Sequence, residues 1–67
     1  MTAFELHNQL LELQAERTLA QETGVAKIGA YMADLERDIE LSRAAFVGAA
    51  VTEIASFRAQ LSGPQVG

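Results

Sequence analysis

A long segment with almost no helix-breaking residue places the tightest constraint on the fold. Residues 26–61 contain no proline, and glycine occurs there only at positions 29 and 48. Apolar residues recur at steps averaging about 3.6, the helical period, and no strand-like alternation persists. The segment therefore predicts a helix over about 26–61, roughly 50 Å long. Its periodic apolar positions are Ile28, Met32, Leu35, Ile39, Phe46, Ala50, Ile54, Phe57 and Leu61.

A shorter helix is predicted before it, over about residues 3–22. Thr2 and Glu5 have the spacing of a capping box, in which the hydroxyl accepts from a backbone amide and the carboxylate reaches back. Gly24 supplies a residue that readily adopts the left-handed conformation at a helix end. Pro64 cannot continue the long helix. We therefore expect one helical domain over 1–61 and a frayed C-terminal tail over 62–67.

The two predicted helices differ in length, which leaves part of the long one uncovered. The helix over 3–22 is roughly 30 Å long and, folded back, reaches only to about residue 45. We therefore predict an all-α fold, a helical hairpin that assembles as an oligomeric helical bundle. One alternative is a monomeric three-helix bundle with a break near 42–48. Another is a continuous rod through Gly24 and Gly29.

The short helix has two apolar edges, separated on one side by an acidic stripe. A single neighbouring helix would cover only one of them, so an apolar arc this wide indicates more than one neighbour. One edge comprises Leu6, Leu10, Leu13 and Ala20, and the other comprises Phe4, Leu11, Ala15 and Leu19.

The second half of the long helix is the predicted oligomer interface. Residues 44–51 carry no charge, and the apolar face turns by roughly a quarter of a circle relative to the first half. Small residues such as Ala44 and Gly48 border this face and permit close helix packing. The predicted interface residues are Phe46, Val47, Ala50, Val51, Ile54, Phe57 and Leu61.

Chain length and composition also favour self-association. A chain of 67 residues buries a small share of its surface and, without cysteine, has no disulfide to stabilise it. We expect the chain to pair with itself, most simply as a dimer with a four-helix arrangement and next as a tetramer.

Residues that could carry chemistry are few. His7 lies with Gln14 and Thr18 between the two apolar edges of the short helix, which makes these three a weak candidate for a polar ligand or metal site. The Glu-x-x-His motif of di-iron bundles is absent, because Phe4 precedes His7 by three positions. No serine has an evident base partner, and no phosphate-binding glycine loop occurs. We therefore expect no enzyme activity, no cofactor and no metal.

The charge balance limits the classes of partner that the chain is expected to bind. Nine acidic residues against five basic ones give a net charge of -4, which argues against nucleic-acid binding. No apolar stretch approaches the ~20 residues of a membrane span, and no secretory signal is visible, so we expect no membrane association and a cytoplasmic location. The sequence thus predicts a small structural or interaction protein. The alternative is an adaptor or regulator that binds a different protein through residues 44–61.

Overall fold

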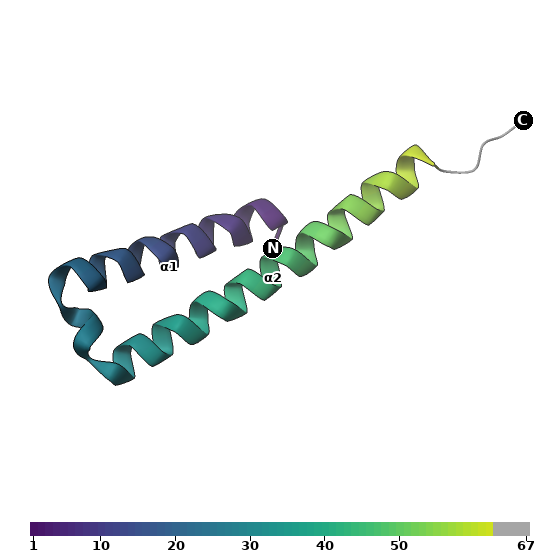
Figure 1. The fold of residues 1–67 in the computed structure, drawn as a ribbon. Helices are drawn as coiled ribbons and strands as arrows, with labels where there is room; N and C mark the ends of the chain where they lie inside the picture. Colours follow the sequence, from purple (N-terminus) through teal and green to yellow (C-terminus); the bar gives the residue numbers. More distant parts are fainter. Residues whose placement is uncertain (63–67) are drawn as a thin grey trace, which may run out of the picture.

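The chain is helical throughout the described part. The computed structural model describes residues 1–62, which form helix α1 (Ala3–Thr23), a 3-10 helix η1 (Val25–Lys27) and helix α2 (Gly29–Leu61). The two α-helices lie side by side and run in opposite directions (Figure 1). The all-α prediction is confirmed. The predicted tail falls, except for Ser62 at the end of α2, outside the described residues.

Local interactions and backbone conformation account for both ends of α1. The backbone amide of Glu5 donates to Thr2 Oγ1 at 3.2 Å, and the Thr2 amide donates to Glu5 Oε1 at 2.9 Å, which completes the capping box. At the other end Gly24 has φ of 84°, a left-handed conformation that a side chain would strain. The predicted α1 boundaries are therefore right to within one residue.

The capping box predicts how helix stability responds to mutation and to acid. Thr2→Ala should cost about 1 kcal/mol, because it removes the hydroxyl that caps the Glu5 amide. Hydrogen bonds from the Thr2 backbone amide and then its hydroxyl lower the pKa of Glu5 below its ordinary value of 4.5. The contribution of Glu5 is therefore present above pH 4.5 and is lost as the pH falls through the lowered pKa. Urea unfolding followed by circular dichroism should show both effects, with Glu5→Gln removing the share of the acid dependence that comes from Glu5.

A narrow apolar seam joins the two helices. The α1 positions with reduced exposure follow steps of three and four residues, as in a coiled coil, and so do the α2 positions opposite them. Leu10, Leu35 and Ile39 form the buried cluster, with Ala20 buried nearer the turn. Leu13, Tyr31, Met32 and Phe46 pack around that cluster. One predicted edge of α1 thus faces α2, while Phe4, Leu11 and Leu19 of the other edge remain exposed.

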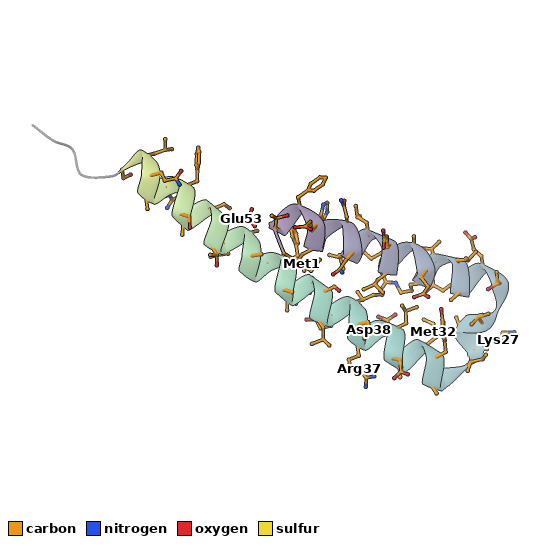
Figure 2. The ribbon with its side chains drawn as sticks, turned by 180° about the vertical axis from the view of Figure 1, so that it is seen from behind. Met1, Lys27, Met32, Arg37, Asp38 and Glu53 are labelled. Atoms are coloured by element: carbon orange, nitrogen blue, oxygen red, sulfur yellow. The ribbon has the colours of Figure 1, made fainter. Side chains whose placement is uncertain are left out.

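The register between the helices differs from the expected one. The amide of Ala3 donates to the carboxylate of Glu53, so α1 reaches that far along α2 rather than to residue 45. Figure 2 shows Glu53 beside the N-terminal Met1. The reason is the connection: η1 occupies residues expected to start the long helix, so α2 begins at Gly29 and the reversal lies further along the chain. The uncovered part of α2 is accordingly shorter than predicted: Ala49 and Ala50 are half-buried, and every residue from 51 to 61 is exposed.

Helix α2 is continuous, and the resulting shape is elongated. It runs from Gly29 to Leu61 through Gly48, so the break near 42–48 required by a three-helix bundle does not occur. The described structure measures 64 × 16 × 13 Å, with a radius of gyration of 17.6 Å. A compact chain of this length would have a radius of gyration of about 11 Å. The end of α2 projects beyond α1 with no other element beside it (Figure 1).

Candidate interaction surface

The predicted interface residues divide into two groups in the structure. Phe46 is half-buried against the cluster of Leu10, Leu35 and Ile39, and Ala50 is also half-buried. Phe46 therefore packs within its own chain, because α1 extends further along α2 than the sequence indicated. The other five residues are exposed, with fractional exposures from 46% to 66%: Val47, Val51, Ile54, Phe57 and Leu61.

The two broad sides of the helix pair differ in chemistry. On one side, His7 of α1 stacks on Phe46 of α2, with ring centroids 4.9 Å apart and planes inclined by 28°. On the opposite side, a hollow between the helices carries two carboxylates. We call these the ring side and the acidic side. The hollow on the acidic side is lined by Gln9, Glu12, Leu13, Asp38, Leu41 and Ser42.

Exposed apolar residues of both helices gather on the ring side. At about 100° per residue, Leu11 and Phe4 lie roughly 40° and 60° beyond His7 around α1. Around α2, Ile54 and Val47 lie roughly 80° and 100° beyond Phe46. Because the helices are antiparallel, these rotations turn both sets toward the same side. Phe4 is 73% exposed and Leu11 48% exposed, so they extend the apolar surface onto α1.

The sequence prediction of the interface did not include the α1 residues. Phe4 and Leu11 belong to the second apolar edge of α1, but nothing in the periodicity of α1 alone shows that this edge adjoins the exposed face of α2. The observation that links the α1 edge to the α2 face is the stacking of His7 on Phe46, which depends on the register between the helices. The candidate surface thus spans two helices rather than one.

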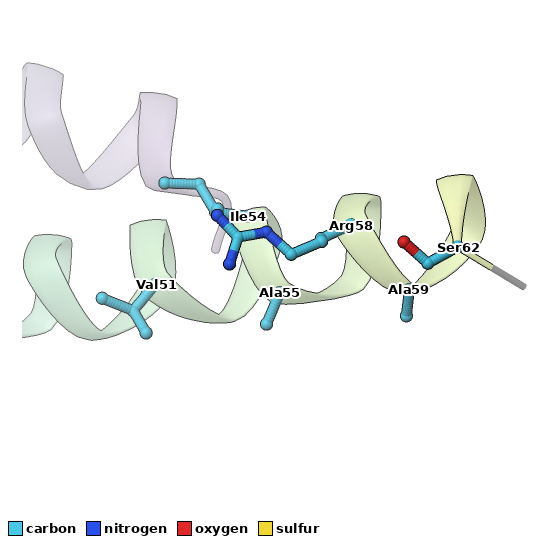
Figure 3. A pocket seen from close by; sticks show the side chains of 6 residues that line it. All are labelled: Val51, Ile54, Ala55, Arg58, Ala59 and Ser62. Carbon is cyan, nitrogen blue, oxygen red and sulfur yellow. The ribbon is translucent and has the colours of Figure 1, made fainter.

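The end of α2 carries an open apolar hollow of about 510 Å³ (Figure 3). Its lining residues come from α2 and its C-cap residue Ser62, so no second element encloses it. Arg58 lies among the apolar side chains, and none of the ion pairs found in residues 1–62 involves it. An open apolar face of this kind is typical of a helix that packs against another protein surface. The lining residues are Val51, Ile54, Ala55, Arg58, Ala59 and Ser62.

The weak polar candidates do not converge on a ligand site. His7 stacks on Phe46, while the Thr18 hydroxyl donates to the Gln14 carbonyl oxygen of the same helix at 3.2 Å. That bond satisfies the hydroxyl locally. Within residues 1–62, no group of three or more histidine, aspartate or glutamate side chains has the geometry to hold a metal ion. In the structure His7 therefore packs against α2.

Charged side chains of α2 form local ion pairs on exposed surface. Arg43 Nε donates to Glu40 at 3.0 Å, and Arg37 donates to Asp34 at 2.7 Å, each across one helical turn. The hydrogen bond and the charge of Arg43 lower the pKa of Glu40. One further pair, Arg17 with Glu36 at 3.4 Å, joins the two helices. Such exposed pairs contribute little to stability, so they leave the carboxylates available to other cations.

One more titratable group faces the acidic side near the turn. Partial burial, and then the neighbouring carboxylate of Glu16, raise the pKa of Tyr31 above its ordinary value of 10.0. A phenol with an ordinary or a raised pKa is protonated at neutral pH, so this hydroxyl is a hydrogen-bond donor.

Comparison with known proteins assigns this chain to no family. Family models, curated proteins and solved structures were each compared with the chain, and none matches it. Within the described residues, neither α1 nor α2 contains a stretch that is both long and apolar enough to cross a membrane.

Proposed function

We propose that this protein is a small structural or interaction protein without catalytic activity, which works as a homo-oligomeric helical hairpin. A dimer with a four-helix arrangement is the simplest assembly, and a tetramer is the next. The observation that carries the proposal is the exposed apolar surface on the ring side, to which both helices contribute. Surface of this kind favours association, because each large side chain that becomes buried contributes roughly 1.5–3 kcal/mol.

The small interior of the single chain supports the same proposal. Within residues 1–62 only Leu10, Ala20, Leu35 and Ile39 are buried, whereas more than twice as many large apolar side chains are exposed. A chain this short without a disulfide needs another source of stability. Burial of the ring side against a second copy would supply it, since four helices enclose a core that two cannot.

Analytical ultracentrifugation of the full chain tests the proposal. The chain mass is 7.2 kDa, so a dimer should sediment with twice that mass at micromolar concentration and dissociate on dilution. Dilution should also lower the thermal unfolding midpoint, because stability is then linked to association. A well-folded monomer over the whole concentration range would contradict the proposal.

A different protein as partner is the second candidate. The hollow on residues 51–62 presents an apolar helix face with a single cation at its centre, which suits a helix-in-groove contact. A monomeric chain that nevertheless retains its helices in isolation would favour this candidate over self-association.

A further inference from the structure

Helix α2 carries a second, outer seam in addition to the one that faces α1. Its positions follow steps of 4, 3, 4, 3 and 4 residues, the spacing of the a and d positions of a coiled coil. All of them are exposed in the single chain. They span about 27 Å along α2, on the ring side and on the neighbouring surface of the helix that points away from α1. The outer seam consists of Glu40, Ala44, Val47, Val51, Ile54 and Arg58.

The outer seam is complementary to itself when two copies run in opposite directions. A two-fold interface requires that if position i contacts position j, then j also contacts i. About a centre near residue 49, Val47 meets Val51 of the second copy and Ala44 meets Ile54 of the second copy. The same symmetry brings Glu40 to Arg58 of the second copy, and each contact occurs twice. Apolar residues thus fill the middle of the seam, and opposite charges meet at both ends.

A parallel arrangement lacks this complementarity. It would set Glu40 against Glu40 of the second copy, and Arg58 against its own equivalent, which costs free energy at both ends of the seam. Within residues 1–62, Arg58 forms no ion pair, so its charge is available. The carboxylate of Glu40 is bound by Arg43, yet 63% of the Glu40 side chain remains exposed and can accept a second cation.

Small residues beside the seam permit the close approach that this packing needs. Gly48 lies at the centre of the contact, and a Cβ atom placed there would have no neighbour within 4 Å in the single chain. Alanine at position 44 likewise leaves room for the larger Ile54 of the opposing helix. Alternating small and large side chains are typical of closely packed antiparallel helices.

We infer that a second copy of this chain binds along the outer seam, antiparallel to the first and related to it by a two-fold axis near residue 49. The inference rests on the proposed self-association and specifies its partner and geometry. Electrostatic complementarity determines the direction of the pair, and the four inner residues supply the apolar contact.

Charge reversal tests the pairing of Glu40 with Arg58. In a two-fold pair, Glu40→Arg places two arginines together at each end, and Arg58→Glu places two glutamates together. Each variant alone should raise the dimer dissociation constant at least about tenfold at low ionic strength. An equimolar mixture of the two variants should recover wild-type affinity, because every contact then joins opposite charges. Sedimentation equilibrium measures the dissociation constants of the two variants, of their mixture and of the wild type.

The control is Asp38→Arg, an equal charge change on the acidic side of the same helix, which should leave the dissociation constant unchanged. Circular dichroism checks that the helices persist in each variant. A wild-type dimer whose affinity responds equally to all three reversals, or whose mixed variants recover nothing, would overturn the inference but leave the proposed function standing. A monomeric wild-type chain would overturn both.

Disulfide cross-linking tests the direction independently, because the chain contains no cysteine of its own. In the antiparallel pair, position 47 faces position 51 of the second copy. A mixture of Val47→Cys and Val51→Cys chains should therefore oxidise to a mixed disulfide faster than either variant forms one with itself. Faster linkage of each variant with itself would indicate a parallel pair and overturn the inference.

Discussion

Replacing Val51 and Ile54 together by aspartate is expected to convert the protein into a monomer that keeps its helices. The two side chains are 61% and 58% exposed in the single chain, so the substitution removes little intrachain packing. In a dimer, however, four apolar side chains would give way to four charges in a buried contact. Each side chain loses roughly 1.5 kcal/mol or more, so the dissociation constant should rise at least about 10,000-fold. Sedimentation velocity measures the mass.

The matched control is Leu41→Asp. Leu41 lies on the same helix and is 62% exposed, but it belongs to the acidic side. Its replacement should leave the oligomer mass unchanged. If Leu41→Asp dissociated the protein while the double variant remained associated, the contact would lie on the acidic side and the assignment of the ring side would be wrong.

Leu35→Ala is expected to have the largest effect on folding. Leu35 is 4% exposed and lies in the cluster with Leu10 and Ile39, at the centre of the seam between α1 and α2. Truncation of a buried leucine costs about 2–5 kcal/mol, because packing contacts are lost and a cavity remains. The small interior of this chain leaves few other contacts to compensate. Urea unfolding at a fixed protein concentration, followed by circular dichroism, should show a large fall in the midpoint.

Leu41→Ala provides the comparison, since it removes the same atoms from an exposed position on the same helix. Its effect on the free energy of unfolding should stay within about 0.5 kcal/mol. Equal effects of the two substitutions would show that Leu35 does not lie in a buried seam. The pair of variants also separates folding from association, because neither residue belongs to the outer seam.

Helix boundaries were the most predictable part of this fold. Thr2 and Glu5 lie three residues apart, and the side chain of each accepts a hydrogen bond from the backbone amide of the other. The start of α1 therefore depends only on local chemistry. Gly24 ends α1 for an equally local reason. The start of α2 was less predictable, because residues 25–27 form a 3-10 helix whose composition does not distinguish it from a first α-helical turn.

The candidate surface was only partly predictable. Helical periodicity correctly placed Val51 and Ile54 on an apolar face that α1 does not cover. It assigned Phe46 to the same intermolecular face, whereas Phe46 contacts His7 and the interior of its own chain. Helical spacing rules pair charges one turn apart, so they do not reveal that Glu40 and Arg58 lie symmetrically about the apolar residues between them.

The sequence by itself determined that this chain forms two helices, where α1 begins and ends, and that more apolar surface exists than one pair of helices can cover. These properties depend on interactions within a few turns of one helix. Only the tertiary structure decided how far α1 extends along α2, that Phe46 packs inward, and that the exposed apolar residues of both helices share one side. Those properties depend on the register between the helices, which the geometry of residues 24–28 establishes and helical periodicity does not contain.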